Sequence, residues 1–182
     1  MPDETNERTA EILEYRRQKD EFFRADPGSP LPPGEREGFT GLAYYPPTAA
    51  LAFEVTPEPF ATPETAVLDT SDGSEREYIR WARLPFLVEG AQAALTVFRD
   101  AETDHLFLPF RDATSGPESY GAGRYLEVPV LEQDEDGEPT LVYLDFNYAY
   151  HPFCAYSPNF SCPLPPGENW LALPVRAGER NS

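Results

Sequence analysis

The apolar side chains of this chain follow two different spacings, and the change between them comes near residue 39. Within residues 5–23, Ile12, Tyr15 and Lys19 recur at helical spacing and alternate with charged positions, and an aromatic pair closes the pattern. The apolar stripe is narrow, as it is in a helix that buries only one side. We therefore expect one N-terminal helix that packs against the outside of a larger body.

The stretch that follows the predicted helix cannot continue it. Residues 26–38 contain four prolines and three glycines, which end regular structure and favour turns. We interpret residues 1–38 as a helix followed by an irregular tether, and residues 39–182 as a single β domain. The full length of 182 residues suits one domain with a sizeable core.

After residue 39 the apolar residues come in short runs separated by polar turn signals such as those at 71–73 and 134–137. Many short strands without helices between them favour an antiparallel β-barrel or sandwich, here of about eight or nine strands. The runs that we predict as strands are 50–55, 65–69, 77–83, 85–88, 93–98, 105–110, 124–130, 141–146 and 170–175.

The charge of the chain indicates the kind of organism it comes from and excludes some classes of partner. Thirty-two acidic residues face fourteen basic ones, the net charge is −18, and Lys19 is the only lysine. An acidic surface poor in lysine is typical of proteins that stay soluble in molar salt, where the Debye length falls to roughly 3 Å. We expect a halophilic cytoplasmic protein. No basic patch is available for nucleic acid, no apolar run reaches the length of a membrane span, and the N-terminus does not resemble a signal peptide.

The segment 143–169 is rich in groups that bind or react. It holds four tyrosines, both cysteines and His151, together with Asp145, Asn147 and Glu168. Cys154 follows His151 by three positions, but a zinc site needs four ligands, so we expect no metal. Three alternatives stay open for the cysteines: buried free thiols, a disulfide, or a catalytic thiolate at Cys154. Glu168 is a candidate general base.

The segment 112–125 is a shaped loop with three glycines. It resembles no phosphate loop, because neither a lysine nor a helix follows the glycines. Asp112 and Thr114 are suited to bond the amides of their own turn. Arg124 opens an apolar strand, so it needs either an internal carboxylate partner or an anionic ligand. We place Glu179, near the C-terminus, at the surface.

Four ordered motifs resemble one protein family. They are 38–46, which begins Gly-Phe-Thr-Gly; Asp112-x-Thr114-x-Gly116 with Tyr120-x2-Gly123-Arg124-Tyr125; Asp145-Phe146-Asn147-x-Ala149-Tyr150-x-Pro152-x-Cys154-Ala155-Tyr156; and Cys162-Pro163-Leu164-Pro165-Pro166-x-Glu168-Asn169 through Ala177-Gly178-Glu179. Together they resemble the DUF1684 family of archaeal and bacterial proteins of unknown function, with this chain as a short form from a haloarchaeon. The family pattern usually has asparagine where this chain has His151. The resemblance implies membership and no activity.

We predict a ligand site in a pocket at one end of the β domain, between the loops 112–125 and 145–169. Three functions from different classes are open: a small-molecule binding domain, with an anion among the candidate ligands; an enzyme that uses Cys154 or a carboxylate with Tyr120 and Arg124; and a structural or protein-interaction domain. The sequence assigns no cofactor and no oligomeric state. The candidate lining residues are Asp112, Thr114, Tyr120, Arg124, Asp145, Asn147, Tyr150, Cys154 and Glu168.

Overall fold

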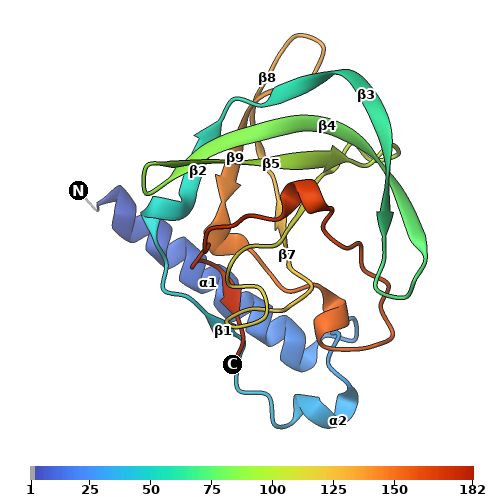
Figure 1. The fold of residues 1–182 in the computed structure, drawn as a ribbon. Helices are drawn as coiled ribbons and strands as arrows, with labels where there is room; N and C mark the ends of the chain where they lie inside the picture. Colours follow the sequence, from blue (N-terminus) through green and yellow to red (C-terminus); the bar gives the residue numbers. More distant parts are fainter. Residues whose placement is uncertain (1–2) are drawn as a thin grey trace.

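The strands form three antiparallel sheets, seen in a computed structural model that describes residues 3–182 (Figure 1). The largest sheet has the order β3-β4-β5-β6-β7, a second has the order β2-β9-β8, and β1 pairs with β10. The strands are β1 (Ala43–Tyr44), β2 (Ala52–Val55), β3 (Glu58–Asp69), β4 (Glu75–Val88), β5 (Ala91–Arg99), β6 (Leu106–Phe110), β7 (Arg124–Glu127), β8 (Val130–Gln133), β9 (Pro139–Asp145) and β10 (Glu179–Arg180). The mainly β, antiparallel fold that the sequence predicts is confirmed.

The main core lies where the inner faces of the two larger sheets meet. Phe146 is fully buried there, and its ring centroid lies 5.3 Å from that of Phe110, 5.4 Å from Phe86 and 6.4 Å from Phe53. These partners come from β6, β4 and β2, so one aromatic cluster joins both sheets. The architecture is sandwich-like, and the described residues form no closed barrel.

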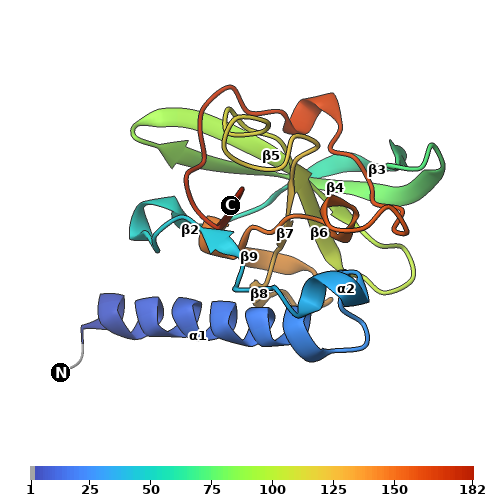
Figure 2. The same cartoon turned by 90° about the horizontal axis from the view of Figure 1, so that it is seen from below.

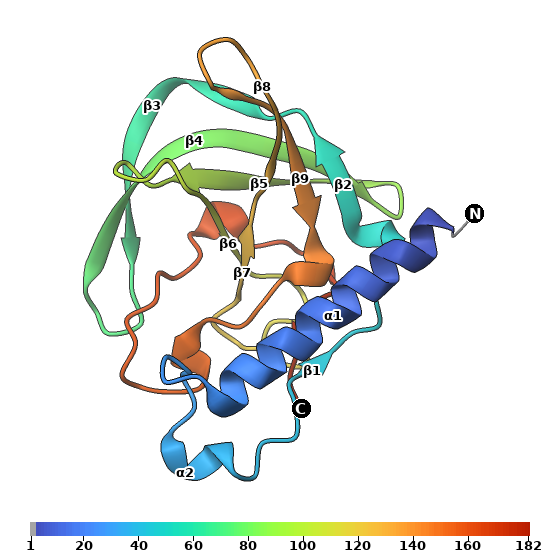
Figure 3. The same ribbon diagram turned by 180° about the vertical axis from the view of Figure 1, so that it is seen from behind.

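The helix α1 (Glu4–Ala25) runs along the outside of the sheets, beside β9 and β2 (Figures 2 and 3). This confirms the predicted N-terminal helix, whose capping residue is Asp3. Its buried residues are Ile12, Arg16 and Phe23. Arg16 donates to the carbonyl of Tyr45 at 2.8 Å, so a cation on the inner face attaches the helix to the β domain.

The tether that follows α1 contains the short helix α2 (Pro33–Arg36) and ends in β1. Two short 3₁₀ helices, η1 (Ala49–Leu51) and η2 (Phe146–Tyr148), flank the second sheet, and two more, η3 (Phe153–Ala155) and η4 (Gly167–Asn169), lie in the long C-terminal loop.

The predicted strand at 170–175 is wrong, because this segment is irregular. The amide of Leu171 donates to the carbonyl of Arg111 at 2.8 Å, but the amide of Val175 donates to a carboxylate oxygen of Asp112 at 2.6 Å. A side chain therefore takes the hydrogen bond that a neighbouring strand would need. Pairing resumes only at β10. None of the helices within residues 3–182 has the length and apolar character that a membrane crossing requires.

Candidate functional site

Arg124 lies in the interior and is surrounded by acceptors of its own chain. Its side chain is 0% exposed. Its guanidinium donates to the carbonyls of Ala177 at 2.6 Å, Val175 at 2.8 Å and Glu179 at 3.0 Å, and it lies 3.4 Å from Asp112. Buried arginines are stabilised by such hydrogen bonds and a paired carboxylate. This side chain has no exposed donor that would hold an anionic ligand.

Asp112 and Thr114 belong to the same internal network. The hydroxyl of Thr114 lies 2.9 Å from a carboxylate oxygen of Asp112, whose other oxygen accepts from the amide of Val175. Asp112 therefore joins its own loop to the C-terminal segment. Three of the predicted site residues, Asp112, Thr114 and Arg124, thus fix the chain internally.

Asp145 and Asn147 attach the start of the helix and the 48–50 turn to the second sheet. Asp145 accepts from Arg8 of α1 at 2.6 Å. Asn147 is 1% exposed; it accepts from the amide of Thr48 at 2.9 Å and donates to the Thr48 carbonyl at 2.7 Å. The amide group of Asn147 is thereby matched on both of its sides.

Glu168 lies on η4, away from these residues, and forms an ion pair with Arg80 at 2.7 Å. It also accepts from the hydroxyl of Thr96 at 2.8 Å. The hydrogen bond from Arg80 holds the pKa of Glu168 below its usual range. A lowered pKa makes a carboxylate a weaker base, so this geometry does not favour Glu168 as a general base.

Tyr120 and Cys154 do come together, with the tyrosine oxygen 3.9 Å from the cysteine sulfur. Burial raises the pKa of Tyr120 to about 12, and burial together with Cys154 raises the pKa of Cys162 to about 11. Both cysteines are unbridged. Tyr120 and Cys162 therefore remain protonated at neutral pH, and neither acts as a base that would activate Cys154.

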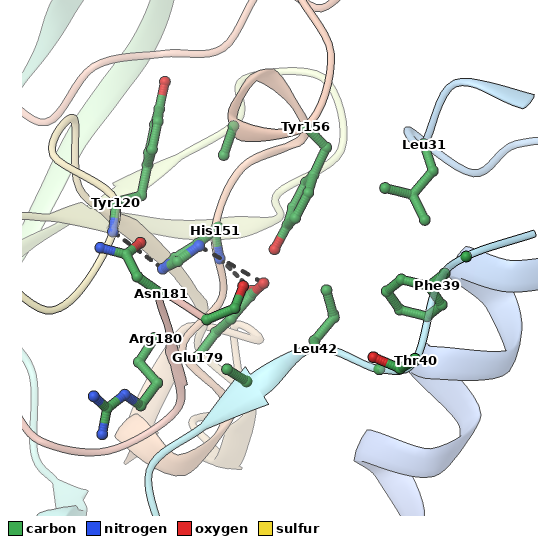
Figure 4. A pocket seen from close by; sticks show the side chains of 15 residues that line it. Leu31, Phe39, Thr40, Leu42, Tyr120, His151, Tyr156, Glu179, Arg180 and Asn181 are labelled. Atoms are coloured by element: carbon green, nitrogen blue, oxygen red, sulfur yellow. Dashed lines mark hydrogen bonds and ion pairs between the residues drawn. The ribbon is translucent and has the colours of Figure 1, made fainter. Parts of the chain in front are cut away.

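A large pocket opens beside Tyr120, between the tether and the C-terminal strand. Its volume is about 520 Å³. We call it the tether pocket; it is lined by Leu31, Gly38, Phe39, Thr40, Gly41, Leu42, Ala43, Tyr120, His151, Ala155, Tyr156, Glu179, Arg180, Asn181 and Ser182. In Figure 4, Leu31, Phe39 and Leu42 form one side, and Tyr156, His151 and Glu179 form the other. The pocket thus has an apolar wall opposite a polar one.

The centre of the polar wall is Glu179, whose side chain is 1% exposed. One carboxylate oxygen accepts from the amide of His151 at 2.7 Å and lies 3.6 Å from the ammonium of Lys19. The other oxygen lies 3.7 Å from His151 Nδ1 and accepts no hydrogen bond within residues 3–182. Burial raises the pKa of Glu179 to about 6, although Lys19 opposes this rise.

His151 is neutral in this arrangement. Its Nε2 accepts from the amide of Tyr120 at 3.2 Å, so its proton resides on Nδ1, facing Glu179. Burial, with Arg124 and Lys19 nearby, lowers the pKa of His151 to about 3. Its Nε2 lone pair is already used, and the described residues contain no cluster of three or more His, Cys, Asp or Glu side chains suited to a metal.

The depressed pKa of His151 predicts an acid-sensitive fold. Below pH 6.5, His151 takes up a proton in the unfolded chain but stays neutral in the folded chain. The contribution of His151 to the free energy of unfolding is therefore complete above pH 6.5 and is lost as the pH falls toward 3. Glu179 acts oppositely, since its contribution is present below 4.5 and lost as the pH rises through 6. We expect the free energy of unfolding, measured in urea, to fall between about pH 7 and about pH 4 by roughly 3 kcal/mol less in His151→Asn than in wild type.

His105→Asn is the matched control, because His105 is an exposed histidine and the chain has 2 histidines in total. Parallel pH profiles for His151→Asn and wild type would show that the imidazole of His151 is not held neutral.

The comparisons with known proteins agree on the family. A family model described as "Protein of unknown function (DUF1684)" matches residues 37–180. The chain belongs to the DUF1684 family. This DUF1684 protein is also similar to an uncharacterised protein of Haloarcula marismortui whose structure was solved by NMR in solution, with 44% sequence identity and a TM-score of 0.71. The match covers 99% of this chain and 97% of that one. A search of the curated proteins finds no match.

These relatives bear on origin and fold. The organism of the NMR structure is consistent with the haloarchaeal origin that the composition indicates. The matched family residues 37–180 begin in the tether and end in β10, and so contain most of the lining of the tether pocket. Neither relative carries an activity in its description.

Of the nine residues predicted from sequence, Tyr120 lines the tether pocket, while Asp145 and Tyr150 line a separate cavity. The surface position predicted for Glu179 is wrong. Val175, Ala177 and Glu179 are all buried. Their spacing of two residues, which places side chains on one face of an extended segment, was the sequence signal that Glu179 points inward. A second signal was Lys19, because a lysine on the apolar side of a helix needs a buried acidic partner, which is Glu179 in the structure.

Proposed function

We propose that this DUF1684 protein is a small-molecule binding domain whose ligand occupies the tether pocket. The observation that carries the proposal is the carboxylate of Glu179, which is enclosed by the fold and keeps one oxygen free of hydrogen bonds within residues 3–182. Because Glu179 also lines the pocket, this oxygen is available as an acceptor for a hydroxyl or amine of a ligand. The proposal retains part of the predicted site, because Tyr120 comes from the first predicted loop and His151 and Tyr156 come from the second.

The two walls define the chemistry of the ligand. A hydroxyl or amine of the ligand would donate to Glu179, and its apolar part would lie against Leu31, Phe39 and Leu42. The volume of about 520 Å³ falls in the range of small-molecule sites. An anion is less suited to the pocket, since Arg180, the basic side chain in the lining, lies over the ring of Tyr45 at 5.0 Å and points away from Glu179 in Figure 4.

Co-purification tests this proposal. The protein is purified in molar KCl and denatured, and the released compounds are identified by mass spectrometry. We expect a hydroxyl- or amine-bearing compound in wild type and its loss in Glu179→Gln. The matched control is Glu138→Gln, which changes a half-exposed carboxylate paired with Arg99 at 2.9 Å. Equal amounts of the same compound in wild type and Glu179→Gln would contradict the site. So would an empty wild-type protein that shows no contact with hydroxyl or amine fragments in ligand-observed NMR.

A second candidate function is proton transfer, which rests on the same side chain. The pKa of Glu179, raised to about 6 by burial, is close to that of an efficient general base at neutral pH. His151 Nδ1 at 3.7 Å would stabilise the ionised form. Chemical change of the released compound on incubation with wild type, but not with Glu179→Gln, would favour an enzyme over a binding domain.

A further inference from the structure

A second cavity lies between α1 and the ends of β7 and β9, and it shares no lining residue with the tether pocket. Its volume is about 230 Å³. We call it the tyrosine cavity; its lining residues are Tyr15, Glu127, Pro129, Tyr143, Asp145, Tyr148 and Tyr150. Four aromatic rings and two carboxylates thus surround a space large enough for a small molecule.

The rings come from different elements, so the fold assembles them. Tyr15 projects from α1, Tyr143 belongs to β9, Tyr148 ends η2, and Tyr150 forms a bridge with Tyr125 of β7. The rings of Tyr15 and Tyr148 meet edge to face, with centroids 5.0 Å apart and an interplanar angle of 74°. An aromatic ring attracts a cation over its negative face, which makes a cavity walled by four rings a candidate site for a cation.

Cations of the chain itself already use two of these rings. The guanidinium of Arg8 lies 5.2 Å from the ring centre of Tyr143 and bonds Asp145, and the ammonium of Lys19 lies 4.7 Å from the ring centre of Tyr150. Within residues 3–182, no lysine or arginine stacks on Tyr15 or Tyr148. The cavity therefore combines two rings that carry a cation with two that carry none.

Two carboxylates lie in the mostly aromatic lining, and both already have partners within the protein. Glu127 accepts from the hydroxyl of Tyr150 at 2.7 Å and contacts His105 with its other oxygen. Burial is the main cause that raises the pKa of Tyr143 and Tyr148; among the nearby charges, Asp145 adds to the rise more than Arg8 opposes it, which indicates a negative field at these rings. A ligand that carries positive charge would offset this field, and one without N–H groups would need no further acceptors.

We propose that the tyrosine cavity binds a small organic cation of the quaternary ammonium type. A trimethylammonium group presents methyl groups to the rings and spreads its charge over them, which is how aromatic residues recognise such ligands. A hydrated metal ion fits less well, because the lining offers two carboxylates among mostly aromatic surface and would not replace its water shell. This site is independent of the proposed function of the tether pocket.

Choline and its neutral isostere, 3,3-dimethylbutan-1-ol, test the proposal. Both are titrated by NMR or calorimetry into the full-length protein at constant KCl, so that the overall charge of −18 acts equally in each experiment. We expect saturable binding of choline and at least roughly tenfold weaker binding of the isostere. Equal affinities would overturn the proposal, as would the absence of saturable choline binding.

Variants locate the site. Tyr148→Leu and Tyr15→Leu should weaken choline binding by roughly tenfold or more, whereas Tyr148→Phe, which keeps the ring, should bind within about threefold of wild type. Tyr15 is 39% exposed, so its replacement tests the site without opening the core. Tyr156→Leu in the tether pocket is the control and should leave choline binding unchanged. Choline binding that survives both leucine variants, or that depends on Glu179 instead, would overturn the assignment.

Discussion

Arg124→Met should lower the free energy of unfolding by roughly 3–5 kcal/mol, which is enough to unfold many domains of this size. The change leaves the buried charge of Asp112 without its cation. It also removes three hydrogen bonds to the carbonyls of Val175, Ala177 and Glu179, which water cannot reach. Urea unfolding in molar KCl, followed by circular dichroism, measures the loss.

The matched control is Arg176→Met. Arg176 pairs with Glu118 at 3.1 Å, but its side chain is 59% exposed. Exposed ion pairs contribute roughly 0–1 kcal/mol, and less at high salt, so this variant should unfold close to wild type. Similar losses for both variants would show that Arg124 does not hold the C-terminal segment. Restoration of stability by Asp112→Asn in the Arg124→Met background would support the unpaired charge as the main cause.

The sequence predicted most of the β elements because periodicity is a local property. Residues 77–83 and 85–88 were predicted as two short strands but belong to one strand, β4, because the ladder with β5 runs through the predicted gap, with Leu84 opposite Leu95. The 170–175 run failed for the opposite reason. It has the apolar residues of a strand, but its hydrogen bonds go to a carboxylate and to a distant loop, which no local pattern records.

The candidate site was predicted less well, because residue type does not reveal how a polar group is satisfied. Asp112, Arg124 and Asn147 are suited to bind a ligand, yet in the structure they bind each other or the backbone. The tether pocket instead forms where the end of the tether pairs with β10, a contact between segments far apart in the sequence. Glu179 lines the tether pocket only through that contact.

The hydrogen-bond network of Arg124 and Asp112 also helps to form the tether pocket. Arg124 holds the carbonyls of residues 175–179, and β10 then pairs with β1, with Glu179 opposite Tyr44. This pairing places the Glu179 carboxylate beside Lys19 and His151. The structural and ligand-binding functions considered from the sequence are therefore compatible, because the same geometry of residues 175–180 would serve both stability and the pocket.

Gly178→Ala is expected to destabilise the protein by more than roughly 3 kcal/mol, because two separate penalties coincide. Gly178 has a φ of +76°, where a side chain is strained. An added Cβ would also lie 2.6 Å from the carbonyl oxygen of Ala149 and 2.7 Å from that of Phe146. Backbone atoms cannot move aside without breaking the hydrogen bond from Glu179 to the same Ala149 carbonyl, at 2.9 Å.

Gly137→Ala separates the two penalties. Gly137 has a φ of +83°, but nothing lies within 4 Å of the position its Cβ would take. That variant should lose only about 1–2 kcal/mol, the cost of a left-handed alanine. If both alanine variants unfold at the same urea concentration, the close approach at Gly178 does not matter. If Gly178→Ala is much less stable than Gly137→Ala and also loses the compound released from wild type, the backbone that positions Glu179 controls the tether pocket as well as the fold.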